Sequence, residues 1–153
     1  MLADEGYAFE IVMVGRVNPS LVALATELSM LNNYVLFKKE VTYAQVAIEM
    51  QQSSALVMFS RFESLPCVIL ESLCCGLPVI SSDVGGIPEV INDQNGILVK
   101  SQNKTQLKEA MKKMIDNYAF YNRKRISEEA ADQFSFPAVG KKIHEVYKSI
   151  IPS

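Results

Sequence analysis

The sequence has no apolar run that could span a membrane, which takes about 20 residues in a helix. Its first ten residues, MLADEGYAFE, lack the charged and then apolar pattern of a secretory signal. It also lacks a strong charge of one sign, because its net charge is -2. No global field therefore favours nucleic acid or anionic lipid. We expect a cytoplasmic protein that does not bind nucleic acid.

Cysteine and histidine are scarce, with three cysteines and one histidine. Cys67, Cys74 and Cys75 lie in one apolar segment, and an odd count without spaced pairs does not indicate a disulfide framework. Adjacent cysteines cannot easily form a tetrahedral zinc site without further partners, and the histidine is distant in sequence. We interpret the three cysteines as buried small hydrophobic residues, and we expect no metal.

The composition is that of a globular protein, with 49% hydrophobic and 21% charged residues. The sequence contains no repeat, low-complexity tract or Pro/Gly/Ser-rich linker, so residues 1–153 are interpreted as one domain. Basic residues cluster late, in KEAMKK, NRKR and GKK, at spacings that favour solvated helix faces. The alternative to a solvated face is that these clusters bind an acidic partner or contact the cytoplasmic face of a membrane peripherally.

Short apolar runs alternate with segments of helical periodicity along the whole chain. The runs predict strands over 9–15, 34–39, 55–60, 78–83 and 96–100. Helices are predicted over 20–31, 42–52, about 64–76, 103–117, 119–134 and 137–151, with a short helix or turn over 87–93. This alternation predicts an α/β fold, a doubly wound (Rossmann-like) parallel sheet of about five strands flanked by helices.

Ligands of such sheets bind beyond the carboxyl ends of the strands. The segment SRFESLPCVILESLCCG follows the third predicted strand. If its helix begins near Ser64–Pro66, with Ser64 as the N-cap, the backbone N–H groups of Cys67, Val68 and Ile69 are free. Together with the helix dipole they form a site for a phosphate group.

Two glutamates, Glu63 and Glu71, flank this predicted helix start. Helical side chains lean toward the N-terminus, so the Glu71 carboxylate is expected to point back toward the phosphate site. Its neighbours in VILESLCC are almost all apolar, so an ionised group there needs partners, and sugar hydroxyls could donate to it. The alternatives are a solvated loop acid at Glu63 and an exposed helix position at Glu71.

The region 60–99 strongly resembles the signature of the family 4 glycosyltransferases, which are retaining enzymes of the two-domain GT-B architecture. The resemblance rests on four features in order: two glutamates separated by seven residues, Gly76-Leu77-Pro78-Val79, Gly85-Gly86-Ile87-Pro88-Glu89, and Asn95-Gly96 before a strand. A weaker likeness covers the chain from Phe9 to its end. The chain is thus similar to the C-terminal, donor-binding domain of these enzymes.

The resemblance implies transfer of a sugar from a nucleotide-diphosphate sugar to a hydroxyl acceptor, with retention of configuration. It implies a hexosyltransferase of polysaccharide or glycolipid biosynthesis that needs no metal or other cofactor. Glu63 would lie against the donor sugar as the catalytic residue, and Glu71 would hold the ribose. Donor sugar and diphosphate would meet Ser64, Leu65, Cys67, Val68 and Ile69, and the base would meet Phe37, Lys38 and Lys39.

The sequence departs from the family pattern at three places. Ser64-Leu65-Pro66 replaces Gly-Phe-Gly, and Pro66 has no N–H to donate. A common glycine is replaced around Lys38-Lys39. The first strand, its basic residues and the N-terminal acceptor-binding domain have no counterpart, so we expect a truncated domain that is inactive alone.

Three other classes of protein have to be weighed against this pattern. A non-catalytic module that binds a sugar nucleotide or a partner remains the alternative. A signalling receiver domain would need acidic residues after the first strand, where Val14-Gly15-Arg16-Val17 has none, and a dinucleotide dehydrogenase would need a Gly-x-Gly-x-x-Gly turn that GRVNPS lacks.

Overall fold

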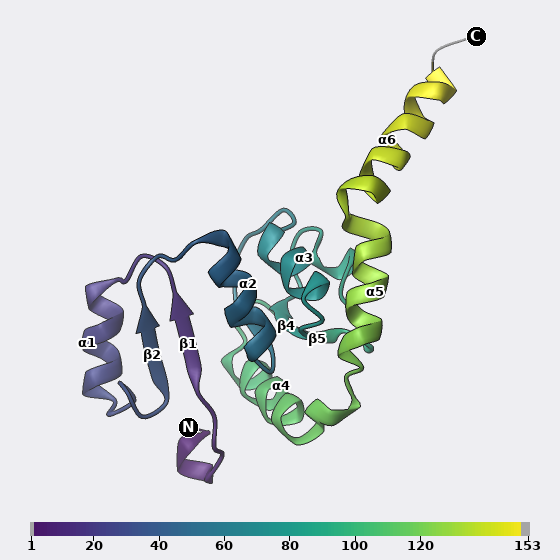
Figure 1. Cartoon of the computed structure of the whole chain (residues 1–153). Helices are drawn as coiled ribbons and strands as arrows, with labels where there is room; N and C mark the ends of the chain where they lie inside the picture. Colours follow the sequence, from purple (N-terminus) through teal and green to yellow (C-terminus); the bar gives the residue numbers. More distant parts are fainter. Residues whose placement is uncertain (1, 151–153) are drawn as a thin grey trace. The chain divides into compact units, whose positions relative to one another are not determined.

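The computed structural model describes residues 2–150, which fall into two compact units that meet between Glu49 and Met50. Residues 2–150 contain five strands and six α-helices, in alternating order up to β4 (Figure 1). All strand pairs are parallel, so the predicted α/β class is confirmed. The strands are paired in two sheets, of two and three strands. Each unit is described by itself.

The first unit contains a short 3₁₀ helix η1 (Ala3–Glu5), β1 (Ile11–Val14), α1 (Pro19–Glu27) and β2 (Val35–Lys38). β1 pairs with β2 from Ile11↔Val35 to Val14↔Lys38. Helix α1 begins within one residue of the predicted start, because Asn18 Oδ1 accepts a hydrogen bond from the N–H of Ser20 and Pro19 occupies the first turn. The prediction that it extends to residue 31 is wrong, because Leu28 is its C-cap and Ser29 is left-handed, with φ 55°.

Helix α2 (Tyr43–Gln52) runs across the boundary between the units. Its start is a capping box: the N–H of Gln45 donates to Thr42 Oγ1 at 3.3 Å, and the N–H of Thr42 donates to Gln45 Oε1 at 3.0 Å. Thr42 is therefore the N-cap, at the predicted start of the helix over 42–52.

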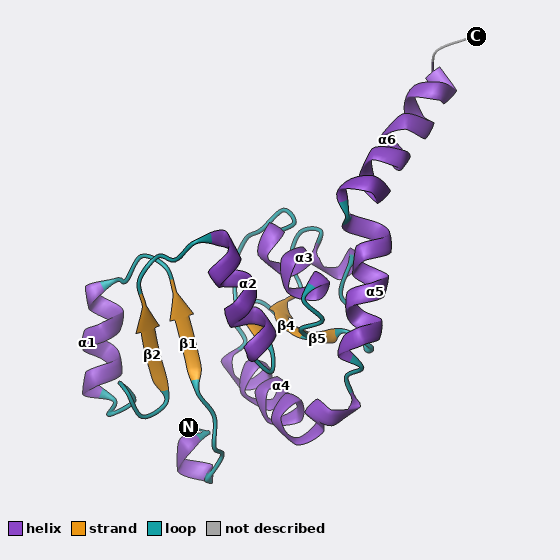
Figure 2. Ribbon diagram, viewed as in Figure 1, coloured by secondary structure: helices purple, strands orange, loops and turns teal. Residues whose placement is uncertain are grey.

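The second unit is built on the sheet β3-β4-β5, formed by β3 (Leu56–Met58), β4 (Val79–Ser82) and β5 (Gly96–Val99). All four residues of the central strand β4 are buried. Helices cover both faces of this sheet (Figure 2). One core cluster joins α3 (Cys67–Cys74) and α5 (Arg123–Phe134) to the sheet, and the other joins α4 (Lys104–Asn117).

Helix α3 ends in a left-handed turn at Gly76, as the sequence predicts. Gly76 has φ 71°, its N–H donates to the Leu73 carbonyl, and the N–H of Leu77 donates to the Ser72 carbonyl. A Cβ at Gly76 would collide with the carbonyl oxygen of Arg123. Only glycine therefore fits both the turn and its contact with α5.

Two connections of the second unit contain short 3₁₀ helices. The predicted helix or turn over 87–93 is a 3₁₀ helix, η2 (Ile87–Glu89), and η3 (Tyr118–Phe120) links α4 to α5. The guanidinium of Arg123, at the start of α5, donates to the carbonyls of Gln51 and Ser53 at 2.9 and 3.0 Å. Arg123 therefore connects α5 to the end of α2 and to the segment before β3.

The final helix, α6 (Phe136–Ile150), follows α5 and has no buried residue. It matches the helix predicted over 137–151, although Ile151 lies outside the described residues. Among the helices of residues 2–150, none is long and apolar enough to cross a membrane.

Candidate functional site

Two loops meet at the carboxyl edge of the three-stranded sheet. The first, residues 59–66, connects β3 to α3, and the second, residues 83–86, connects β4 to η2. Because β3 and β4 are parallel neighbours, their carboxyl ends lie side by side. The predicted site residues Glu63, Ser64 and Leu65 all belong to the first loop.

The first loop is held at two points by its backbone carbonyls. The carbonyl of Ser60 accepts a hydrogen bond from Ser101 Oγ at 3.1 Å, and the carbonyl of Ser64 accepts one from the N–H of Gly86 at 2.5 Å. Glu63 lies between these points and is half-buried. Its position therefore depends on backbone contacts with loops that come later in the sequence.

The glycine pair of the second loop allows this close approach. Gly85 has φ 58°, a left-handed conformation that favours glycine. A Cβ at Gly85 would collide with the carbonyl of Glu63 and lie 2.6 Å from that of Ser64. Sequence reasoning identified Gly85-Gly86 only as a motif. A glycine pair directly after a strand was the signal for such a backbone contact.

Helix α3 begins at Cys67, so the prediction of Ser64 as its N-cap is wrong. Pro66 is the N-cap, with extended backbone (φ −69°, ψ 128°) and no side-chain capping bond. A residue before proline avoids helical backbone, which keeps Leu65 out of the helix. The bond between Gly86 and the Ser64 carbonyl also holds this part of the loop outside the helix.

The amides of the first turn of α3 are only partly available. The N–H of Ile69 donates to the carbonyl of Pro66 at 3.1 Å, so the prediction that it is free is wrong. The Ile69 side chain is fully buried in the core. Within residues 2–150, the N–H groups of Cys67 and Val68 make no hydrogen bond, as expected at a helix start. These two amides remain as donors for an anion.

Glu71 lies half-buried in the second turn of α3, between positions that pack into the core. Its charge acts on the end of its own helix. The pKa of the Cys74 thiol is raised by burial first, and then by Cys75 and Glu71. Burial and Glu71 also raise the pKa of Cys75, which Arg123 partly opposes.

The interpretation of all three cysteines as buried is wrong, because Cys67 and Cys74 are exposed.

Two serines stand at the carboxyl end of β4. Ser81 and Ser82 are fully buried, and neither hydroxyl has a hydrogen-bond partner within residues 2–150. Buried hydroxyls are nearly always hydrogen-bonded in proteins. The end of β4 therefore carries two hydroxyl groups whose hydrogen bonds are not made by any of the described residues.

The residues predicted to contact the base lie in the first unit. Phe37 is half-buried in β2, and Lys39 is exposed just beyond it. The ammonium of Lys38 is bound by both carboxylate oxygens of Glu49 in α2, at 2.7 and 2.8 Å. Glu49 therefore satisfies the charge of Lys38, and the assignment of these residues to the base stays a prediction.

Phe62 was not identified from the sequence. It precedes Glu63 in the first loop and its side chain is 90% exposed. The signal for Phe62 in the sequence was an aromatic residue directly before Glu63, among the polar residues that follow β3. Its ring adds an exposed apolar surface to the loop that contains Glu63.

Potential metal ligands do not gather in the described part of the chain. No three His, Cys, Asp or Glu side chains of residues 2–150 are placed so that they could hold a metal ion. The two-loop site is instead composed of one carboxylate, backbone amides and an exposed aromatic ring.

In a sequence comparison, residues 2–133 match the family described as Glycosyl transferases group 1. The chain is 28% identical to the uncharacterized glycosyltransferase MJ1178 of Methanocaldococcus jannaschii, over 97% of this chain and 42% of that protein. It thus spans less than half the length of this relative.

Solved structures share the fold. Sucrose-phosphate synthase from Thermosynechococcus elongatus matches with a TM-score of 0.80 and 23% identity, over 92% of this chain and 38% of that one. Anabaena HepE in complex with UDP matches with a TM-score of 0.79 and 21% identity, over 92% and 41%. HepE was also solved with UDP-glucose. At these identities the matches show the fold alone, which is that of GT-B glycosyltransferases.

Proposed function

Because the chain belongs to the glycosyl transferases group 1 family, we propose that it is the donor-binding domain of a retaining family 4 enzyme. It would bind a nucleotide-diphosphate sugar and transfer the hexose to a hydroxyl acceptor, in polysaccharide or glycolipid synthesis. The observation that carries the proposal is the meeting of the Glu63 loop, Gly85-Gly86 and the start of α3 at one sheet edge. The nucleotides bound to HepE support this class of donor.

Each side of the site has a role in this proposal. Glu63 contacts the hydroxyls of the donor sugar, and Glu71 holds the ribose. The amides of Leu65, Cys67 and Val68 bind the diphosphate without a metal ion. Transfer breaks the bond between the anomeric carbon and the phosphate oxygen, and negative charge develops on the departing diphosphate.

The start of α3 is suited to that leaving group. Preorganised N–H groups aimed at a developing charge are commonly the largest single contribution to such catalysis. The acceptor oxygen attacks from the face that the diphosphate leaves, and its proton passes to the departing phosphate. Retention follows without a covalent intermediate on Glu63.

Catalysis would also need an acceptor-binding domain. The chain spans 42% of the length of MJ1178, so a protein of that size has room for such a domain outside the matched part. We propose that residues 1–153 alone bind the donor but do not transfer the sugar. A binding module without catalysis is the second candidate, since the departure at Ser64-Leu65-Pro66 removes one donor amide.

Calorimetric titration of this chain with UDP-, GDP- and ADP-sugars tests donor binding. We expect one nucleotide sugar to bind, and Glu71→Gln to weaken its Kd about tenfold, because a hydrogen bond to a charged group is worth about 1.5–3 kcal/mol. Glu128→Gln on the exposed side of α5 is the matched control and should leave Kd unchanged. Absence of binding by every donor, or equal effects of the two substitutions, would refute the site.

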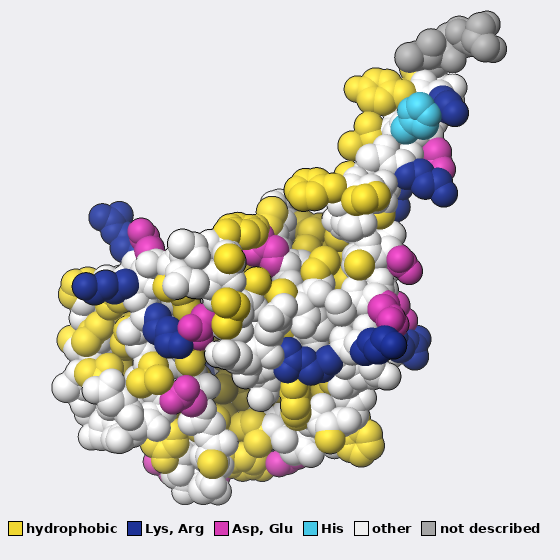
Figure 3. Space-filling view, in the orientation of Figure 1, with side chains coloured by type: hydrophobic (Ala, Val, Ile, Leu, Met, Phe, Trp, Pro, Cys, Tyr) yellow, Lys and Arg dark blue, Asp and Glu magenta, His cyan; other side chains and the backbone are white. Residues whose placement is uncertain are grey.

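We also propose that α6 contacts the cytoplasmic face of an anionic membrane. Its apolar residues recur every three or four positions and are 39–97% exposed: Phe136, Val139, Ile143, Val146, Tyr147 and Ile150. They line one side of the helix, and charged side chains line the other (Figure 3). Three lysines against one glutamate give this helix a positive charge. Such helices bind anionic lipid surfaces.

A further inference from the structure

A second concave site lies along the edge strand β5 and the turn that precedes it. Its volume is about 600 Å³, which is within the range of small-molecule sites. Five segments form its walls: the turn before β5, β5 itself, the end of α4, η3 and the first half of α5. The turn precedes β5, whereas the loops of the candidate site follow β3 and β4. The cavity is thus separate from the site of the proposed function.

One wall of the cavity is a turn fixed by its own hydrogen bonds. The N–H of Gln94 donates to Asn92 Oδ1 at 2.9 Å, and the N–H of Asn92 donates to Asn95 Oδ1 at 2.8 Å. The amide of Asn95 donates to the Val90 carbonyl at 2.9 Å. On the opposite wall, Asn122 Oδ1 caps α5 by accepting from the N–H of Arg125. The walls are therefore preorganised.

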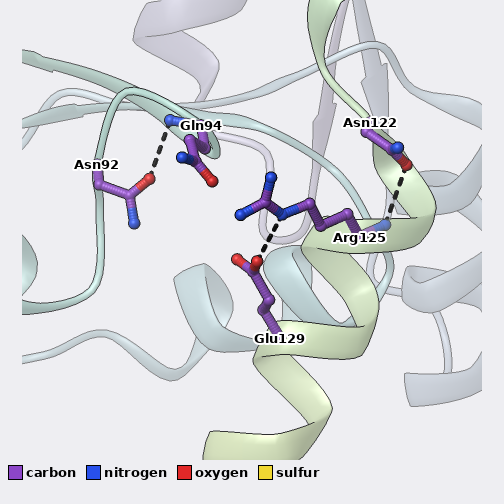
Figure 4. Close-up of polar contacts among 5 residues, drawn as sticks. All are labelled: Asn92, Gln94, Asn122, Arg125 and Glu129. Carbon is purple, nitrogen blue, oxygen red and sulfur yellow. Dashed lines mark hydrogen bonds and ion pairs between the residues drawn. The ribbon is translucent and has the colours of Figure 1, made fainter.

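These bonds leave several polar groups available to a ligand. Within residues 2–150, the side-chain amide of Gln94 and the amide nitrogens of Asn92 and Asn122 have no hydrogen-bond partner. Figure 4 shows the Gln94 amide facing the guanidinium of Arg125, whose Nε donates to Glu129 Oε1 at 2.6 Å. The cavity thus offers exposed donors and acceptors beside a turn that is held by its own hydrogen bonds.

The charges around the cavity cancel. Lys113 and Arg125 supply two positive charges, and Asp93 and Glu129 supply two negative charges. A phosphate or carboxylate would meet as much repulsion as attraction. The balance of charge selects a neutral ligand that both donates and accepts hydrogen bonds.

An aromatic ring completes the cavity. Phe120 lines it, and its side chain is 84% exposed. A pyranose has an apolar face of C–H groups that packs on an aromatic ring, and a rim of hydroxyls that pairs with amides and carboxylates. We propose that this cavity binds a neutral oligosaccharide. The site acts independently of donor binding at the carboxyl edge.

An NMR titration of the complete chain tests the proposal. The probes are maltotetraose, cellotetraose, chitotetraose and mannotetraose, with inorganic phosphate as the anion. We expect at least one tetrasaccharide to shift the backbone amides of Gln94, Asn95 and Asn122 in a saturable way. Amides of Leu65 and Gly86, at the carboxyl edge, should not move.

Two substitutions connect the shifts to the cavity. Phe120→Ala should weaken the Kd about fivefold, as expected for loss of an aromatic contact. Phe136→Ala, which removes another highly exposed ring, from α6, should leave the Kd unchanged. Gln94→Ala keeps the backbone bond to Asn92 and should also weaken binding.

Three results would overturn the proposal. They are the absence of shifts with all four tetrasaccharides, equal effects of Phe120→Ala and Phe136→Ala, and stronger shifts at these amides with phosphate than with any sugar. Donor binding in the calorimetric titration is measured separately. Failure of one site therefore leaves the result for the other intact.

Discussion

Gly85 couples the two loops of the candidate site, and a single methyl group should disrupt them. Gly85→Ala places a Cβ against the Glu63 carbonyl and forces alanine into a left-handed conformation. The conformation alone costs about 1–2 kcal/mol. We expect a total loss of about 3 kcal/mol in the free energy of unfolding, because the collision adds a second cost of similar size. Urea denaturation measures it.

Two other glycines separate these costs. Gly6 has φ 80° and no atom near the position of a Cβ, so Gly6→Ala reports the left-handed conformation alone. Gly140 lies in α6 with open space around it, so Gly140→Ala should leave stability equal or slightly higher. If Gly85→Ala costs no more than Gly6→Ala, the loops do not depend on this contact.

Individual residues differ in how well the sequence reveals them. Glu71 was found because a carboxylate among apolar neighbours needs a partner. The pairing of Lys38 with Glu49 was not foreseen, because the two residues are 11 positions apart, in β2 and α2, and only the fold brings them together. The same holds for Gly85, whose contact with Glu63 depends on the order of the strands.

At the scale of elements, periodicity identified the helices and strands, and local chemistry decided their ends. Capping signals at Thr42 and Gly76 worked because the bonds they form are local. The start of α3 was misplaced because a bond from Gly86, far along the chain, holds Ser64 outside the helix. The pairing of the strands in two sheets was also beyond a pattern that contains no long-range information.

The apolar face of α6 gives a prediction for that element. The chain should sediment with phosphatidylglycerol vesicles and remain in solution with phosphatidylcholine vesicles. Ile143→Asp should lower the partition coefficient about tenfold or more, because burying an isoleucine is worth about 1.5–3 kcal/mol. Ile143 is 51% exposed, so the substitution should not unfold the chain.

Leu24→Asp is the matched control for this experiment. Leu24 is an apolar residue of α1 with similar exposure, 48%. Membrane contact through α6 would be refuted by equal losses in the two variants, or by equal binding to both kinds of vesicle.

At the scale of the whole molecule, the two units differ in the size of their cores. Among the described residues, the buried hydrophobic side chains of the first unit are Leu2, Ala25 and Val35. The second unit contains both core clusters. A two-stranded sheet with so little burial is marginally stable by itself.

Amide hydrogen exchange should therefore be uneven along the chain. We expect the slowest exchange in β4 and the buried turns of α3, and much faster exchange in β1, β2 and α1. NMR of the chain in D₂O measures the rates. Protection of β1 equal to that of β4 would show that the first unit is stabilised by more than its own core.

The way in which the Glu63 loop is attached affects how the protein can evolve. The two hydrogen bonds that hold the loop are accepted by the backbone carbonyls of Ser60 and Ser64. They therefore do not depend on which side chains lie between these residues. Arg61 and Phe62 can therefore be exchanged without loss of the loop's path. Under the proposed function, new sugar preferences would arise there by point mutation, while the glycine pair that supports the loop would have to be inherited unchanged.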